Sequence, residues 1–315
     1  MSDAPCNVLD AGATGAIDAA AAAIRSGGVV GLPTETVYGL AGDALSERAV
    51  ARIFAVKGRP ATHPLILHLA DASWLPEWVE TVSGAAELLA RECWPGPLTL
   101  LLQAAAHLPR TPLGGRDTAA FRVPAHATAQ SVIAASARPL AAPSANRFGR
   151  VSPTTAAHVC ADLGTEVDVV LDGGPSVLGI ESTIIDVSGR SIQVLRHGAL
   201  PVEDLEAVLG VAIEEASGSS RAPGMLASHY APSCAVRLAD GVDEARKMAS
   251  DESDHGRTAR ILPHHDAAPL YAATLYDELR RSDRDGVDTV IAVLPPARGL
   301  GRAIRDRLEK AAAPR

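Results

Sequence analysis

Lysine is scarce in this 315-residue chain: of 29 basic residues only Lys57, Lys247 and Lys310 are lysines, and the other 26 are arginines. Aromatic residues make up 3%, so the core has to be built from Ala, Val, Leu and Ile, which the 47% hydrophobic content supplies. The 37 acidic residues give a formal net charge of −8. That charge argues against a general nucleic-acid coat protein, which needs positive charge to displace counterions.

Long apolar runs and clustered cysteines are also missing. The run 19–24 is short and lies between Asp18 and Arg25, and no basic segment resembling a secretory signal precedes it. We therefore expect a soluble, cytoplasmic protein with no membrane partner. The absence of a CxxC pair argues against a zinc ribbon or a thioredoxin-type site and favours free, buried thiols at Cys6, Cys93, Cys160 and Cys234.

Several catalytic signatures are absent from the sequence. There is no GxxxxGK[ST] phosphate loop, no GxSxG nucleophile turn and no HExxH metal pair. The turn at Gly299 and Gly301 lacks the third glycine of a dinucleotide fingerprint, because Ile304 stands in that place. Evidence for the function therefore has to come from the polar residues at the ends of the predicted strands.

Strands and helices alternate through the first two thirds of the chain, which predicts an α/β domain. The helices are too few for a regular doubly wound fold, so we expect an open, twisted, mixed sheet. The expected strands are 29–32, 65–69, 98–102, 119–123, 140–142, 167–171, 183–187 and 193–195, and the expected helices are 16–26, 46–56, 85–93, 127–137, 154–163 and 202–209.

A change in composition divides the chain. The segment 214–223 is rich in Ser, Gly and Glu, which is typical of a linker. Beyond it lies a smaller α/β pattern with strands 235–238, 259–262 and 287–294, helices 243–249, 270–281 and 302–312, and a polar loop at 251–257. We expect a large domain at 1–212, a linker at 213–233 and a smaller Rossmann-like domain at 234–315.

Polar side chains follow the predicted strands. In GLPTETVYGL (31–40), Thr34, Glu35 and Thr36 come directly after a buried strand, where either a capped turn or a ligand site fits. In KGRP, Lys57 ends a helix and Gly58 is suited to a left-handed cap. Arg would stabilise the helix end equally well, so a retained Lys beside an Arg favours an anion site.

Cations concentrate in one part of the large domain. The segment 110–150 holds six arginines against one aspartate, a net charge of +5, whereas 240–285 holds eleven acids and seven bases, a net charge of −4. Further strand ends carry hydroxyls, an amide or an arginine, in FRVP, PSAN, VSPT, EST and LRHG. Such a set suits a nucleoside triphosphate, and the lack of a nucleophile–base pair favours catalysis by positioning and charge neutralisation at phosphorus.

Taken in order, these motifs are recognisable. GLPTETVYGL, KGRP followed by PLILH, WPGPLT, FRVP, APSAN, ESTIID and LRHG resemble the YrdC/Sua5 family of L-threonylcarbamoyladenylate synthases over about residues 16–210. APGMLASHYAP at 222–232 resembles the linker of the two-domain Sua5 type. The resemblance implies an open α/β sheet with a basic cleft. It also implies formation of threonylcarbamoyl-AMP and pyrophosphate from L-threonine, bicarbonate or CO2, and ATP, for the t6A modification at tRNA position 37.

The resemblance also implies site residues. Arg122 would hold the carboxylate of L-threonine, Lys57 and Arg59 would be catalytic, and Tyr230 would act as a lid over the nucleotide. Mg2+ would arrive with ATP, since no acidic metal-binding cluster is visible. His63 stands where the family often has Asn, and Ser152 could also cap the following helix. The full threonine site would be Thr36, His68, Arg122, Ala142 and Ser182, and the ATP site Arg59, His63, Thr118, Ser144, Asn146, Ser152, Arg196 and Tyr230.

Two alternatives stay open at this point. Isolated members of this fold are connected with double-stranded RNA, and the +5 segment would support a non-enzymatic RNA- or tRNA-binding module. Related domains occur in carbamoyltransferases of hydrogenase maturation, although their extra zinc-finger and acylphosphatase-like regions are missing here. If the chain is the synthase, the resemblance implies that its partners are the substrates and the downstream tRNA threonylcarbamoyl transfer machinery. Weak binding of RNA stays open as well.

Overall fold

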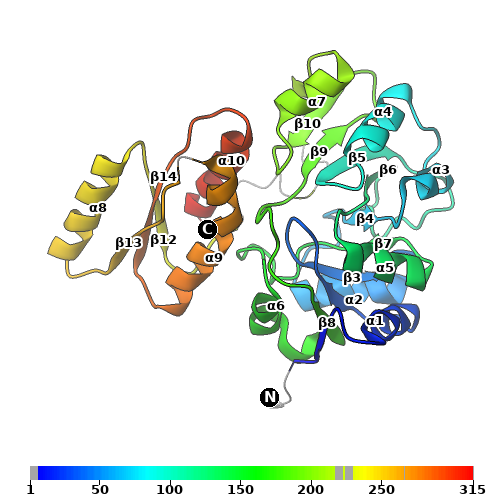
Figure 1. The fold of residues 1–315 in the computed structure, drawn as a ribbon, viewed down its shortest axis with the longest axis horizontal. Coiled ribbons are helices and arrows are strands. Elements are labelled where there is room, and N and C mark those ends of the chain that lie inside the picture. The colour runs from blue at the N-terminus through cyan, green and yellow to red at the C-terminus, as the bar shows by residue number, and fades with distance from the viewer. Residues whose placement is uncertain (1–5, 217–222, 224–229, 266, 315) are drawn as a thin grey trace.

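Eleven strands within the described residues form one mixed sheet that runs through the larger of two units (Figure 1). The computed structural model describes residues 6–216, 223, 230–265 and 267–314. In spatial order the strands are β1 (Val8–Asp10), β8 (Val169–Asp172), β2 (Val30–Leu32), β3 (Gly39–Asp43), β7 (Leu140–Ala141), β4 (Ile66–His68), β6 (Thr118–Arg122), β5 (Leu98–Gln103), β9 (Thr183–Asp186), β10 (Gln193–Arg196) and β11 (Glu214–Glu215).

Parallel and antiparallel pairs alternate irregularly across this sheet. The pairs β1–β8, β2–β8, β4–β6, β5–β9 and β10–β11 are parallel, and the other neighbours are antiparallel. The mixed α/β sheet expected from the sequence is confirmed. Strand β3 was not predicted, because its sequence GLAGD has little of the β-branched and aromatic character that marks a strand.

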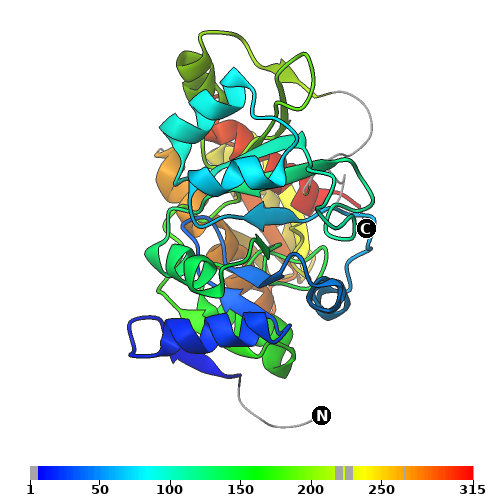
Figure 2. The same ribbon diagram turned by 90° about the vertical axis from the view of Figure 1, so that its right-hand side faces the viewer.

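Helices cover the sheet through small and branched apolar side chains. Figure 2 shows α1 (Ala16–Arg25) next to α5 (Ala127–Ser136), and their Ile24, Val132 and Ile133 share one fully buried cluster. A second cluster holds residues of the remaining helices of this unit. These are α2 (Glu47–Lys57), α3 (Leu75–Trp78), α4 (Gly84–Cys93), α6 (Ala156–Leu163) and α7 (Val202–Leu209), with short 3-10 turns at Ala72–Trp74 and Gly164–Glu166.

The ends of α2 follow the sequence closely. Ser46 accepts a hydrogen bond from the Ala49 amide at the start of the helix, and Gly58 takes a left-handed conformation with φ of 62° at its end. The expected cap is confirmed, and it directs the chain into KGRP.

The smaller unit is a three-layer α/β structure. Its parallel sheet has the order β12 (Ala235–Ala239), β14 (Thr289–Val293) and β13 (Ala259–Ile261). Helix α8 (Val242–Asp254) covers the outer face, and α9 (Ala268–Arg284) and α10 (Leu300–Ala312) lie between the sheet and the large unit (Figure 1). One hydrophobic cluster joins the two units, because Val37, Val151 and Ile180 pack with buried residues of α9 and α10.

Three sequence expectations are wrong. The polar segment 251–257 is not all loop: α8 continues to Asp254, because Glu252 is buried between Arg237, Arg257 and Thr289. The cap of α6 is Thr155 and not Ser152. Cys6 and Cys160 form a disulfide across 154 residues, whereas Cys93 is a free thiol; Cys93 and Cys234 are both partly buried. Most of the expected linker motif at 222–232 lies outside the described residues, which there include 223 and 230–232.

Candidate active site

A cleft opens where six strands of the large sheet begin or end. It is lined by residues that follow β2 and β7, by the last residues of β4, β6 and β10, and by the residues just before β9. The cleft brings together nine predicted site residues, namely Thr36, Arg59, His68, Arg122, Ala142, Ser144, Ser182, Arg196 and Tyr230.

Arg122 lies at the end of β6 and is almost fully buried. Its Nη2 is 2.7 Å from Oε1 of Glu35, and its Nε donates to the Gly96 carbonyl at 3.1 Å. Burial raises the pKa of Glu35, but the Arg122 guanidinium and backbone donors outweigh it, so the pKa lies below its usual value. The two side chains are therefore a charged, buried pair at the predicted threonine site.

His68 lies on β4 beside Arg122 of the neighbouring strand β6. Burial, reinforced by the charge of Arg122, lowers the pKa of His68 to about 3, so the ring is neutral at physiological pH. Its Nδ1 is buried and has no hydrogen-bond partner among the described residues. A buried polar atom without a partner is costly, and a bound ligand could supply one.

The Thr34–Thr36 turn shapes the floor of the cleft. The Thr34 hydroxyl donates to the Val37 carbonyl at 2.6 Å and lies 2.9 Å from the Thr36 hydroxyl. Of the two options that the sequence left open, the structure shows a hydrogen-bonded turn that also lines the cleft.

Arg196 at the end of β10 fixes the EST segment. Its Nε and Nη2 donate to the Ser182 carbonyl at 3.0 and 2.9 Å, and Nη2 also donates to the Ser182 hydroxyl at 3.0 Å. That hydroxyl lies 2.8 Å from the Thr99 hydroxyl. Gly198 permits this approach, since a Cβ there would lie 2.3 Å from the Ser182 carbonyl carbon.

Arg59 reaches the cleft from the loop after α2. Its Nη2 donates to the Pro64 carbonyl at 2.9 Å, and its guanidinium lies 5.7 Å from the centroid of the Phe148 ring. Burial lowers the pKa of Arg59 to about 10, so it stays cationic at neutral pH. His63 contacts the same Phe148 ring, and burial with the nearby cations lowers its pKa, which makes it a neutral donor near pH 7.

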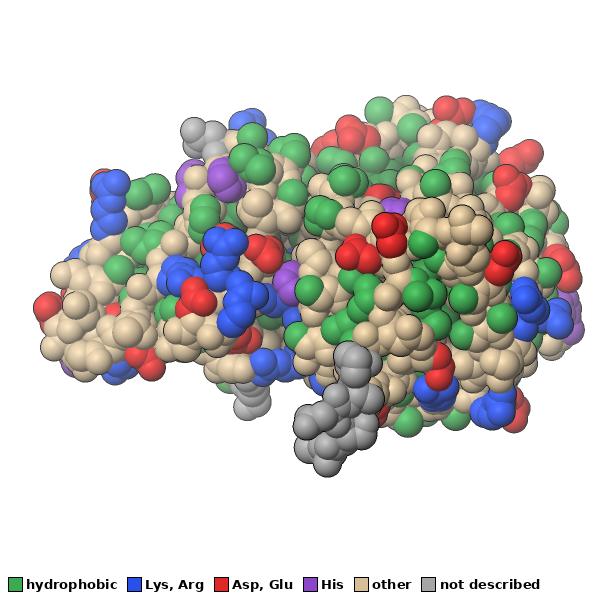
Figure 3. Space-filling view, turned by 60° about the horizontal axis from the view of Figure 1, so that its bottom comes forward, with side chains coloured by type: hydrophobic (Ala, Val, Ile, Leu, Met, Phe, Trp, Pro, Cys, Tyr) green, Lys and Arg blue, Asp and Glu red, His purple; other side chains and the backbone are tan. Residues whose placement is uncertain are grey.

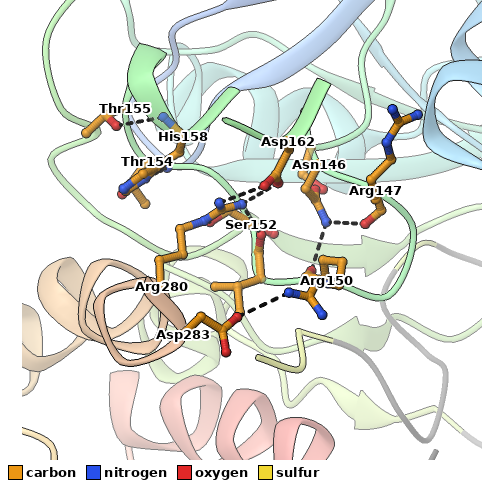
Figure 4. A network of polar contacts seen from close by, with 12 residues as sticks. Asn146, Arg147, Arg150, Ser152, Thr154, Thr155, His158, Asp162, Arg280 and Asp283 are labelled. Carbon is orange, nitrogen blue, oxygen red and sulfur yellow. Dashed lines mark hydrogen bonds and ion pairs between the residues drawn. The ribbon is translucent and has the colours of Figure 1, made fainter. Parts of the chain in front are cut away.

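Lys57 lies behind the cleft wall. Its Nζ donates to the carbonyls of Ser144 (2.5 Å) and Asn146 (2.6 Å), and the side chain is 2% exposed. Asn146 in turn donates to the carbonyls of Arg147 and Arg150 (Figure 4). Lys57 thus fastens the segment that carries Ser144 and Asn146.

The remaining predicted residues do not line the cleft. Thr118 begins β6, at the opposite end of the strand from Arg122, and the Ser152 hydroxyl donates to Glu181 at 2.7 Å. The sequence placed Glu35 beside Thr34 and Thr36 but gave it no role as partner of Arg122, and Glu181 was not identified as a site residue. Both glutamates lie inside motifs already singled out, PTET and EST. A carboxylate in a region with so many arginines was the signal that could have indicated an ion pair.

The arginines of the +5 segment do not form a free basic face. Five of them pair with carboxylates, and Arg116 donates to the Thr62 carbonyl. The pairs are Arg110–Asp117, Arg122–Glu35, Arg138–Asp43, Arg147–Glu166 and Arg150–Asp283. In Figure 3 basic and acidic side chains are interspersed over the visible face of both units. This arrangement gives the RNA-binding alternative no continuous cationic surface on that face.

The fold and the cleft define a member of the Sua5, YciO and YrdC class. Residues 22–198 match the model of that family, which is described as telomere recombination, and residues 200–313 match the model of the threonylcarbamoyl-AMP synthase C-terminal domain. The chain belongs to the threonylcarbamoyl-AMP synthase family. It is 40% identical to the threonylcarbamoyl-AMP synthase of Pyrococcus abyssi over 93% of this chain and 92% of that protein, and 37% identical to that of Bacillus subtilis over the same shares.

Solved structures agree with this assignment. P. abyssi Sua5 complexed with L-threonine superposes with a TM-score of 0.89 at 40% identity, covering 94% of each chain. Escherichia coli YciO matches with a TM-score of 0.53 at 26% identity, covering 63% of this chain and 96% of its own. Among the described residues, no helix is long and apolar enough to cross a membrane.

Proposed function

We propose that this chain condenses L-threonine, bicarbonate or CO2, and ATP into threonylcarbamoyl-AMP and pyrophosphate, and that the product supplies the t6A modification at tRNA position 37. The observation that carries the proposal is the match of both units to a synthase family, including a relative with L-threonine bound. The cleft chemistry supports it: cations for a carboxylate and for phosphates lie beside neutral hydrogen-bonding groups.

The threonine end of the cleft is at Arg122. A guanidinium can hold a carboxylate through two parallel bonds, and here its orientation is fixed by Glu35 and the Gly96 carbonyl. His68 Nδ1 would accept or donate one further hydrogen bond to the substrate, depending on its tautomer. Thr36, Ala142 and Ser182 line the same space.

The nucleotide end is at Arg59 and Arg196. The amine of L-threonine adds to CO2 and loses a proton, giving a carbamate. A carbamate oxygen then attacks the α-phosphorus, and the bond to the pyrophosphate oxygen breaks. Negative charge that develops on the phosphates would be stabilised by these cations and by the hydroxyl of Ser144, without a covalent enzyme intermediate.

We propose that Mg2+ enters the cleft as a complex with ATP. No group of three metal-binding side chains is found among the described residues, and the cleft carboxylate Glu181 is engaged by Ser152, Tyr276 and Arg307. Mg2+ would therefore arrive with the triphosphate and be held by its oxygens.

Tyr230 fits the proposed lid. It lines the cleft, is 1% exposed, and its neighbour Ala231 donates to the Gly149 carbonyl at 3.0 Å. The enclosed space is about 60 Å3, well below the roughly 300–1,000 Å3 of small-molecule sites. We propose that Tyr230 withdraws to admit ATP.

Pyrophosphate release tests the proposed function. The full chain is expected to release pyrophosphate from ATP only when L-threonine and bicarbonate are both present. Release that is independent of either one, or no release, would overturn the proposal.

A further inference from the structure

Glu181 connects the cleft to the small unit. It is 6% exposed and lines the cleft two residues before β9. Its Oε1 accepts from the Ser152 hydroxyl at 2.7 Å, and its Oε2 accepts from the Tyr276 hydroxyl at 2.8 Å and from Arg307 Nε at 2.8 Å. One oxygen therefore faces a predicted ATP residue, and the other faces α9 and α10.

Arg307 is fully buried although it is an arginine. Besides Glu181 it contacts the Asp306 carboxylate at 2.5 Å, and its Nη2 has no hydrogen-bond partner among the residues described. An apolar side chain of similar size would join two domains without the cost of removing a charge from water. A structural role alone therefore explains this arginine poorly.

Tyr230 contacts Arg307 and Tyr276, the two residues of the small unit that bind Glu181. The Arg307 guanidinium lies 5.0 Å from the centroid of its ring, and the Tyr276 ring stacks against it at 5.8 Å. The small unit thus contacts both Glu181 and the proposed lid residue.

We propose that Arg307 is a positioning residue of the nucleotide site: it holds the cleft carboxylate Glu181 in place, and through the ring contact it seats Tyr230. The inference rests on the proposed function, and it assigns the small unit a part in the reaction. Without Arg307, Glu181 would lose its main counter-charge, and Tyr230 would lose the guanidinium that lies against its ring.

Arg280 offers a matched control on the same face. It also joins the two units and is mostly buried. It contacts the Asp162 carboxylate at 2.6 and 3.0 Å, as Figure 4 shows, the Ser152 carbonyl at 3.2 Å and the Val151 carbonyl. Its polar contacts within the described part of the chain go to Val151, Ser152 and Asp162, not to Glu181 or Tyr230. An effect of Arg307 that Arg280 does not share is therefore not a general effect of loosening the junction.

The groups that face Glu181 determine the expected pH profile. They are Ser152, Tyr276 of α9, Arg307 of α10 and, through its charge, Arg196 of β10. Burial raises the pKa of Glu181, but Arg307 and Arg196 hold it at about 2, so the carboxylate stays ionised at every working pH. Loss of Arg307 would raise this pKa and bring an acid limb into the profile of kcat/KM for ATP.

The test compares Arg307→Met, Arg307→Lys, Tyr276→Phe and Arg280→Met in the full chain. We expect Arg307→Met to raise KM for ATP and the calorimetric Kd for ATP about tenfold, with a smaller change in KM for L-threonine and a new acid limb. Arg307→Lys should recover part of the ATP affinity and remove the acid limb. Arg280→Met should lower the unfolding midpoint while keeping KM for ATP within about twofold.

Two results would overturn the inference. One is a folded Arg307→Met variant with wild-type ATP affinity and pH profile, and the other is equal ATP defects in Arg307→Met and Arg280→Met. If Arg307→Met does not fold, Tyr276→Phe must still weaken ATP binding by a few fold, or the inference fails. Calorimetry needs no turnover, so it tests Arg307 even if the wild-type chain fails the pyrophosphate test of the proposed function.

Discussion

The Arg122 guanidinium and the Glu35 carboxylate lie 2.7 Å apart, and both side chains are almost completely buried. The Glu35 carboxylate stabilises the Arg122 cation inside an apolar sheet before any substrate binds, since an unpaired buried charge would be very costly. It also fixes the plane of the guanidinium that we expect to meet the threonine carboxylate.

The first prediction concerns Arg122→Lys. An ammonium keeps the charge but cannot form two parallel bonds to a carboxylate. We expect KM for L-threonine to rise about 10- to 100-fold, with KM for ATP changed much less. Initial rates at varied L-threonine measure this, with Arg110→Lys as the control outside the cleft. A rise confined to KM for ATP would contradict the assignment.

His68 predicts a pH dependence of stability. Its native pKa of about 3 lies below the unfolded value, so between pH 6.5 and 3 the unfolded state binds more protons. Stability therefore falls as the pH falls, by up to about 1.4 kcal/mol per pH unit from this group. Urea unfolding of wild type and His68→Asn between pH 6.5 and 5 measures the difference. Equal slopes in the two proteins would contradict the assigned pKa.

Gly179 tests the fit of the two units. Its φ is +72°, and a Cβ there would lie 2.5 Å from the Ala272 carbonyl oxygen on α9. Gly174 has a φ of +81° but nothing within 4 Å of the added Cβ, so Gly174→Ala carries the backbone cost alone. We expect about 1–2 kcal/mol of destabilisation for Gly174→Ala, and about 1–3 kcal/mol more for Gly179→Ala. Equal unfolding midpoints in the two variants would exclude the close contact.

Lys57→Ala and Arg59→Ala are expected to differ in their effect on the stability of the fold. Lys57→Ala leaves two carbonyls without their donor, which costs about 1–3 kcal/mol for each buried group, whereas Arg59 is only partly buried. We expect both alanine variants to lower kcat by about 100-fold or more, and only Lys57→Ala to lose marked stability. Lys247→Ala, at an exposed site, is the control. If turnover falls only in proportion to unfolding, the anion-site hypothesis fails.

Local features of the sequence predicted what lies within one motif. The predicted helix 46–56 and the left-handed cap at Gly58 agree with α2, and Arg122 and Arg196 were assigned at the strand ends where they lie. Contacts between distant segments could not be predicted in this way. Tyr276 and Arg307 lie 95 and 126 residues from Glu181, on helices whose apolar periodicity says only which face is buried. The Cys6–Cys160 disulfide and the glycine-rich strand β3 were not predicted for the same reason, because both depend on pairing with segments that are distant in the sequence.

The most direct test of the account is the fate of carbon from bicarbonate. The full chain is incubated with ATP, L-threonine and 13C-labelled bicarbonate, and the nucleotide products are resolved by mass spectrometry. The account predicts an adenylate that contains both threonine and one labelled carbon, formed together with pyrophosphate. A threonine adenylate without the labelled carbon, or ADP in place of the adenylate, would contradict it.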